Sequence, residues 1–224
     1  WGHVGVVLLC VASDAVALTG PLPYLPQFCQ RQLGIPDDQV GNYVGALIGA
    51  FSIANFVSSA ILGHMSDLYG RRPFLLSGVL VSAVCSCALG FIHDPALAIL
   101  SRGTIGLFNA NFAIGRATIS DMVPPHLRAL PFAYTGASFA LARAMSSAVG
   151  GLSVGLFWSE EYGPYVAPSL VTASPLIASF LATLLILPES HHGRKYKHPI
   201  RALCGMEGGQ EPPKAVKGGG GGKR

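Results

Sequence analysis

The stretch Gly63-His64-Met65-Ser66-Asp67-Leu68-Tyr69-Gly70-Arg71-Arg72 decides the fold, because it lies between two long apolar segments. It holds an acid, a glycine turn and two adjacent arginines, whereas residues 41–62 and 73–91 contain no Asp, Glu, Lys or Arg. Arginine next to a membrane-spanning segment is retained on the cytoplasmic side. We therefore expect these ten residues to form a short cytoplasmic loop that orients every other span.

The composition indicates a membrane protein. Half of the 224 residues are hydrophobic and only 12% are charged, which is too apolar for an ordinary soluble domain. The net charge of +4 does not indicate nucleic-acid binding, because eight of the fifteen Lys and Arg residues gather in residues 190–224, as a basic cluster beside the membrane. This tail is rich in Gly and Pro and is expected to be a disordered cytoplasmic linker, separate from a bundle formed by residues 1–189.

Six segments are long and apolar enough to cross a bilayer, which takes about 20 residues in a helix. They are residues 2–20, 41–63, 73–91, 95–120, 130–156 and 166–187. With this topology the inside loops and tail hold Arg71, Arg72, Arg128 and the eight basic residues of the tail, and the outside loops hold only Arg31. This bias predicts an all-α, multi-pass integral membrane protein of six transmembrane helices, with both ends in the cytoplasm.

A family resemblance rests on Gly63, Asp67, Gly70, Arg71 and Arg72, which form the pattern G-x-x-x-D-x-x-G-R-R. This pattern resembles the loop between helices 2 and 3 of major facilitator superfamily (MFS) transporters. The resemblance covers residues 2–189 and implies the N-terminal six-helix half of an MFS fold, whose C-terminal half is absent from this chain. It also implies that the loop gates conformational change.

A second charge pair is expected on the same side as this loop. Asp121 and Arg128 follow the fourth span, and together with Asp67 and Arg71 they could latch one conformation and release in another. The simpler alternative is that all these groups are solvated loop charges.

Ionisable residues inside the spans are candidates for function, because a charge there is costly unless it is paired or faces water. We expect Asp14, in the first span, to bind and release a proton during transport; the alternative is a structural acid near the outer interface. Arg102 and Asn109 share a face of the fourth span. Arg102 followed by Gly106 resembles the family's R-x-x-x-G pattern, whose Arg is tied to proton transfer in proton-coupled members, so Arg102 is expected to modulate Asp14.

Two further arginines lie in the spans. Arg143, in the fifth span, is expected to hold an anionic substrate group or the carboxylate of Asp14, or else a polar group of the absent half. Arg116, near the cytoplasmic end of the fourth span, is expected to snorkel to the interface or to pair with an acid of the loop.

Several glycines have spacings that favour close helix packing. Gly41, Gly45 and Gly49 line one face of the second span, and part of this face is expected to meet the absent half. Gly106, in the fourth span, and Gly150 and Gly151, in the fifth, are the other packing candidates. Gly150 and Gly151 resemble the end of the G-P-x-x-G-G signature of MFS antiporters, although Ser146 and Ser147 occupy the positions of its first Gly and Pro.

The sequence therefore predicts a secondary active transporter that works by alternating access and exchanges a small molecule for protons, resembling the drug:proton antiporter-like and zinc-induced-facilitator-like branches. Its expected partners are the lipid bilayer, the substrate and protons. The alternatives are a facilitator or anion-coupled porter, and a truncated membrane protein without transport activity. The cysteines and histidines show no metal-ligand spacing, and no cofactor, nucleic-acid or enzyme motif is found.

Overall fold

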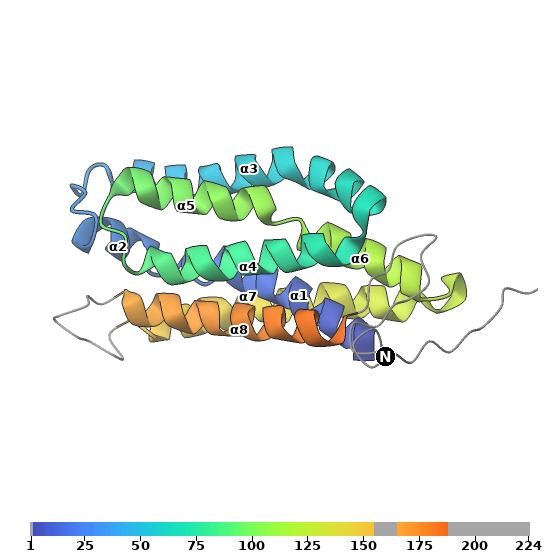
Figure 1. Ribbon diagram of the computed structural model, residues 1–224. Coiled ribbons are helices and arrows are strands. Elements are labelled where there is room, and N and C mark those ends of the chain that lie inside the picture. The colour runs from blue at the N-terminus through green and yellow to red at the C-terminus, as the bar shows by residue number, and fades with distance from the viewer. Residues whose placement is uncertain (1, 155–164, 188–224) are drawn as a thin grey trace, which may run out of the picture.

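The computed structural model describes residues 2–154 and 165–187, and within these ranges the chain is a bundle of helices (Figure 1). The elements are α1 (Gly2–Thr19), α2 (Leu25–Arg31), α3 (Val40–Tyr69), α4 (Arg71–Leu89), α5 (Pro95–Phe108), α6 (Asn111–Met122), the 3₁₀ turn η1 (Pro125–Leu127), α7 (Ala129–Leu152) and α8 (Val166–Ile186). The expected tail at 190–224 lies outside the described residues.

The six predicted spans correspond to α1, α3, α4, α5 with α6, α7 and α8. Five of them are long and apolar enough to cross a membrane by length and composition. The exception is α7, whose 24 residues suffice in length but include Arg143 and several small polar side chains. The N-terminus, the end of α3 and the end of α8 lie at the same end of the bundle (Figure 1), as an even number of spans requires.

The bundle is held by close approach of small residues. The helix α3 packs along α5, α4 along α8, and α1 against α7 and α8. Gly106 lies against the backbone oxygen of Phe51 in α3, and Gly150 lies against the backbone oxygen of Gly20 just after α1, so a side chain at either glycine would collide with the neighbouring backbone. Helices associate in lipid through such close backbone contacts, because burial of apolar side chains contributes little to the free energy of association there.

The sequence prediction of a ten-residue loop at Gly63–Arg72 is wrong. Residues 63–69 continue α3, Arg71 already belongs to α4, and Gly70 alone lies between the helices. Gly70 has φ 105°, in the region that favours glycine because it has no Cβ. The chain can therefore reverse at one residue, and the charged residues on both sides remain helical.

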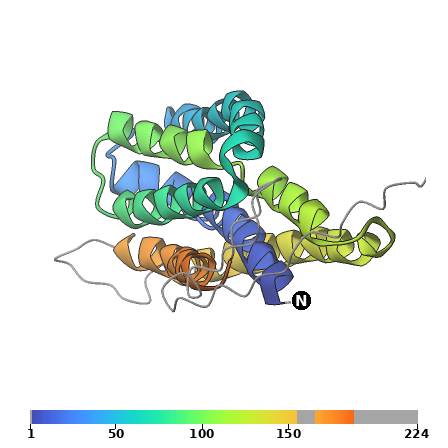
Figure 2. The same ribbon diagram turned by 45° about the vertical axis from the view of Figure 1, so that its right-hand side comes forward.

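The fourth span is also not the continuous helix that the sequence predicted. It begins where Asp94 Oδ1 accepts hydrogen bonds from the backbone N–H of Ala96, at 2.7 Å, and of Leu97, at 3.4 Å. It then breaks at Asn109 and Ala110, so that α5 and α6 are separate (Figure 2). The loop expected after the first span contains a further helix, α2.

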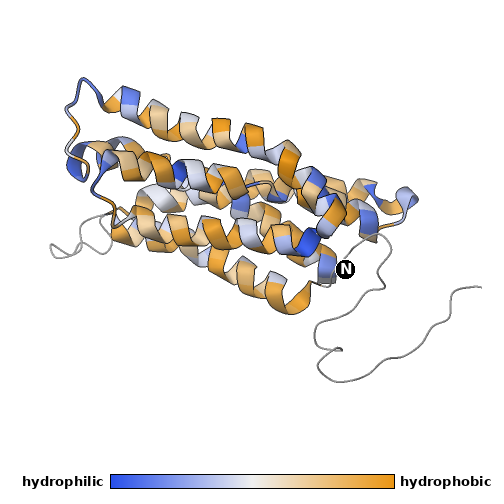
Figure 3. Cartoon of the chain, turned by 45° about the horizontal axis from the view of Figure 1, so that its top comes forward, coloured by the Kyte–Doolittle hydropathy of each residue, from blue (hydrophilic) through white to orange (hydrophobic). Residues whose placement is uncertain are grey.

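Hydrophobic residues predominate along the helices of the bundle, as the colouring by hydropathy in Figure 3 shows. They are most exposed on α3, where Phe56 is 81% exposed. The glycines Gly41, Gly45 and Gly49 are on this helix as well, and a Cβ at any of them would meet no atom within 4 Å among the described residues. This face of α3 is therefore not used for packing within the described bundle.

Candidate functional site

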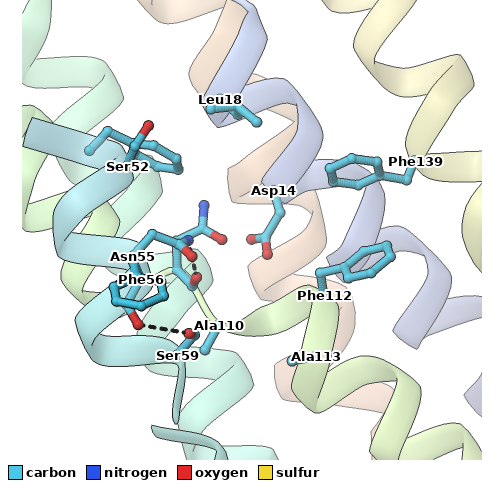
Figure 4. A pocket seen from close by; sticks show the side chains of 12 residues that line it. Asp14, Leu18, Ser52, Asn55, Phe56, Ser59, Ala110, Phe112, Ala113 and Phe139 are labelled. Carbon is cyan, nitrogen blue, oxygen red and sulfur yellow. Dashed lines mark hydrogen bonds between the residues drawn. The ribbon is translucent and has the colours of Figure 1, made fainter. Parts of the chain in front are cut away.

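A cavity of about 550 Å³ lies beside α1, at the level where the fourth span is broken. Its lining combines an acid, two amides and two hydroxyls with apolar and aromatic side chains (Figure 4). The lining residues are Asp14, Leu18, Phe51, Ser52, Asn55, Phe56, Ser59, Asn109, Ala110, Phe112, Ala113 and Phe139. A few convergent polar groups within an apolar wall are typical of a small-molecule site.

Asp14 is the acid of this cavity and is 3% exposed. Its Oδ1 accepts a hydrogen bond of 2.7 Å from Nδ2 of Asn111, the first residue of α6. Among the residues that the structure describes, its Oδ2 has no hydrogen-bond partner. Figure 4 shows the carboxyl group directed between the Asn55 side of the cavity and the Phe112 side. One oxygen is thus fixed by the start of α6, and the other is left for a proton or a ligand.

The break in the fourth span is stabilised by α3. Asn55 donates a hydrogen bond of 2.6 Å from Nδ2 to the backbone oxygen of Asn109, and Ser58 donates one of 3.1 Å to the backbone oxygen of Gly106. These side chains satisfy carbonyl groups whose helical partners are lost at the break. Asn55 and Asn111 were missed by the sequence reasoning, although an amide inside an apolar segment is a usable signal.

Gly78 on α4 makes room for the contact between Asn111 and Asp14. A Cβ at Gly78 would lie 2.5 Å from Oδ1 and 2.7 Å from Nδ2 of Asn111, and 2.7 Å from the backbone oxygen of Phe108. Real Cβ atoms do not approach polar atoms so closely. The absence of a side chain on α4 therefore fixes where the Asn111 amide can lie, and hence how Asp14 is held.

The predicted cavity residues separate into two groups. Asp14 and Asn109 line the cavity. Arg102 is 3% exposed and donates from Nη1 to the backbone oxygen of Ala17 at 3.1 Å, one turn away from Asp14 along α1. Arg143 is exposed and lies with its guanidinium carbon 5.8 Å from the ring centre of Phe139. The structure brings neither arginine into an ion pair with Asp14.

The predicted gating residues gather at the Gly70 end of the bundle. Arg71 contacts two carboxylates, that of Asp67 through Nη1 at 2.7 Å and that of Asp121 through Nε at 2.5 Å. Arg72 donates from Nη2 to the backbone oxygen of Leu184 at 2.7 Å. The expected pair of Asp121 with Arg128 is not formed, because Arg128 donates to the backbone oxygen of Val123 at 2.9 Å. Gly63 lies within α3, one turn before Asp67.

Of the two alternatives expected for Arg116, the ion pair with an acid of the loop is not formed. Its guanidinium carbon lies 5.8 Å from the ring centre of Phe112 and 5.2 Å from that of Phe132. It therefore takes part in cation–π contacts rather than in an ion pair with Asp67 or Asp121.

A helical membrane bundle with a mainly apolar cavity that contains a few polar groups, beside a broken span, is an architecture typical of membrane transporters. The sequence profile of the Major Facilitator Superfamily matches residues 7–218, and the chain belongs to this family. Membership confirms an all-α membrane protein that forms one half of the family fold, and it places the chain among transporters rather than enzymes.

Relatives of known name are similar along most of the chain. The tetracycline resistance protein of class G from Vibrio anguillarum is 32% identical over 84% of the chain and 45% of its own length. The class C protein from Escherichia coli is 28% identical over 88% of the chain and 48% of its own length. The chain thus spans about half the length of the curated relatives it matches.

Solved structures support the fold. The human organic anion transporter MFSD10 superimposes with a TM-score of 0.70 at 22% identity, over 84% of this chain and 48% of its own. The proton:xylose symporter XylE superimposes with a TM-score of 0.71 at 12% identity, over 84% of this chain and 45% of its own. At these identities the likeness defines the architecture of one half and nothing finer.

Proposed function

We propose that this chain forms one half of a secondary active transporter that exchanges a small molecule for protons by alternating access. The similarity to tetracycline resistance proteins supports the drug-antiporter branch. The chain works together with a second six-helix half, since transporters of this kind bind substrate near the bilayer midplane between two repeats.

The single observation that carries this proposal is the half-satisfied carboxyl group of Asp14 in the cavity. Asn111 holds Oδ1, and Oδ2 is free to take a proton. Of the neighbouring groups that can carry charge, Cys10 lies one turn away on α1, and Arg102 is bonded to the backbone oxygen of Ala17. No cation among the described residues pairs with Asp14, so its charge is neutralised by a proton or by a ligand.

Conformational switching is proposed to act through the two carboxylates that hold Arg71. Asp67 is on α3 and Asp121 is at the end of α6, so the pair of contacts joins three helices at one end of the bundle. Separation of α3 from α6 would break one contact and leave the other. The cluster can therefore stabilise one state of the cycle and release it in the next.

The orientation proposed for the chain places this end in the cytoplasm, with both chain termini. Arg71, Arg72 and Arg128 lie at this end, and positive residues beside spans stay on the cytoplasmic side. Single cysteines at Leu127 and Asp38 should react with an impermeant maleimide from opposite sides of sealed vesicles.

The test is uptake into vesicles driven by a pH gradient, measured on the complete two-half transporter. Asp14→Asn keeps the shape and the bond to Asn111 but cannot ionise, so pH-driven accumulation should fall to the level without a gradient while exchange at equal pH persists. Asp38→Asn, which removes an exposed acid of the outer loop, is the matched control and should behave as the wild type. Full accumulation by Asp14→Asn would show that coupling lies elsewhere.

A facilitator or anion-coupled porter is the second candidate, and one observation favours it. The described spans hold three arginines, the buried Arg102 and the exposed Arg116 and Arg143, against the single buried acid Asp14. If this candidate is correct, a pH gradient will not drive accumulation in the wild type, whereas an inward anion gradient will.

A further inference from the structure

A row of two adjacent rings flanked by guanidinium groups borders the cavity on the α6 and α7 side. The rings of Phe112 and Phe139 both line the cavity, with their centres 5.0 Å apart. Arg143 lies over Phe139, and Arg116 lies over Phe112 on the other side of the pair, at 5.8 Å in each case. Figure 4 shows the two rings on the side of Asp14 opposite Asn55 and Ser52.

Helical spacing produces this row. Phe139 and Arg143 are four residues apart on α7, and Phe112 and Arg116 are four residues apart on α6, so each arginine lies over the ring one turn away. The two helices meet at the Phe112–Phe139 pair. The row therefore runs past the cavity with aromatic surface in the middle and positive charge at both ends.

The two arginines differ in how fully they are held. Arg116 lies between two rings, Phe112 and Phe132, whereas Arg143 contacts only Phe139. Neither belongs to an ion pair among the described residues. A guanidinium that stacks on a ring keeps its N–H edge free to donate two parallel hydrogen bonds to a carboxylate.

The exposed guanidinium of Arg143 is open to an anion. A cation inside a spanning helix is costly unless it is paired or faces water. Asp14, the one acid in the interior of the described spans, is bonded to Asn111 instead. The positive charge of Arg143 thus has no protein counter-ion in the described residues.

We propose that the substrate is a planar aromatic anion, whose ring packs on Phe112 and Phe139 and whose carboxylate is bound by Arg143. This assignment rests on the proposed transport function and names its substrate class. The guanidinium supplies the charge-assisted hydrogen bonds, and the ring pair supplies the apolar platform. Asp14, on the opposite side of the ligand ring, disfavours a second negative group there.

The test is binding to the purified 224-residue chain in detergent, measured by calorimetric titration with three probes of one shape: 2-naphthoate, 2-naphthylmethanol and 2-naphthylmethylammonium. The anion should bind at least about tenfold more tightly than the cation. Arg143→Gln should weaken naphthoate binding by about tenfold to a hundredfold, as expected for lost hydrogen bonds to a charged group, and leave the neutral probe unchanged.

Two further variants separate charge from shape. Phe139→Leu should weaken all three probes by about threefold to tenfold, because an aromatic pair is lost. Arg31→Gln, which removes an equal charge from the exposed end of α2, is the matched control and should leave naphthoate binding as in the wild type. Unchanged helicity and elution volume show that each variant is folded.

Three results would overturn the assignment: tighter binding of the ammonium probe, no binding of naphthoate, or naphthoate binding that Arg143→Gln does not affect. The last would mean that a group other than Arg143 binds the carboxylate. None of these results bears on the proposed proton coupling, which the Asp14→Asn uptake experiment tests. Conversely, if the uptake experiment finds no proton coupling but naphthoate binding depends on Arg143, the proposed function fails and the proposed substrate class holds.

Discussion

The charged residues at the Gly70 end of the bundle and those within the spans differ in the groups that they contact. Arg71 contacts the carboxylates of Asp67 and Asp121. Within the spans, Asp14 accepts a hydrogen bond from the Asn111 amide, Arg102 donates one to a backbone carbonyl, and the exposed Arg143 stacks on an aromatic ring. Ion pairs are easily formed where water is near, whereas in lipid an unpaired group is expensive and is kept where it has a function.

The largest effect is expected from a substitution of Gly78, which disrupts the contact between Asn111 and Asp14. Gly78→Ala places a methyl group against the Asn111 amide and should lower the free energy of unfolding by about 1 to 3 kcal/mol, the usual cost of overpacking. It should also separate Asn111 from Asp14. Gly103→Ala is the matched control, since a Cβ at Gly103 meets no atom within 4 Å. Unfolding in detergent with increasing denaturant measures both; equal stability of the two variants would contradict the packing described at Gly78.

Tyr24 is a buried ionisable residue at the opposite end of the bundle, outside the spanning helices. It is 2% exposed and its ring stacks on Tyr165, with centres 5.9 Å apart. Burial raises the pKa of Tyr24 from 10.0 to about 12. The unfolded state therefore loses its proton first, so stability is full below pH 10 and falls by about 2 to 3 kcal/mol as the pH rises to 12.

The measurement is the free energy of unfolding against pH for the wild type and Tyr24→Phe. The variant cannot ionise at this position, so its curve should be flatter than that of the wild type between pH 10 and 12. Parallel curves would show that Tyr24 ionises in the folded state as readily as in the unfolded state.

The smallest effects are expected at the Gly70 end, where the two partners of Arg71 differ in exposure. The Asp67 side chain is 56% exposed and that of Asp121 is 21% exposed. Asp67→Asn should change the free energy of unfolding by less than about 0.5 kcal/mol, and Asp121→Asn should lower it by about 1 kcal/mol. Both should slow transport in the complete transporter with little change in substrate affinity. Equal loss of affinity and turnover would indicate misfolding instead of a gating role.

The sequence predicted the spans well, because length and hydropathy are local properties. It did not predict the break at Asn109, since the hydrogen bond that stabilises the break comes from Asn55 on another helix. The prediction of a ten-residue loop was wrong for a related reason. A charged stretch between apolar segments indicates a loop, but a single glycine with positive φ suffices to reverse the chain.

Side-chain partners were harder to predict than helices. Asp14 was correctly singled out as a buried acid, because an ionisable residue in an apolar segment is a local signal. Its contact with Asn111 and the contact of Arg102 with Ala17 depend on the relative height and rotation of helices. One chain without these tertiary constraints cannot supply them, which is why Arg102 and Arg143 were expected beside Asp14.

We propose that Asp14 carries the proton that is exchanged for substrate. Simultaneous measurement of proton and substrate flux across vesicles that contain the complete transporter tests this role. We expect coupled fluxes in the wild type, and substrate flux without proton flux in Asp14→Asn. Proton flux that still accompanies substrate in Asp14→Asn would contradict this role of Asp14.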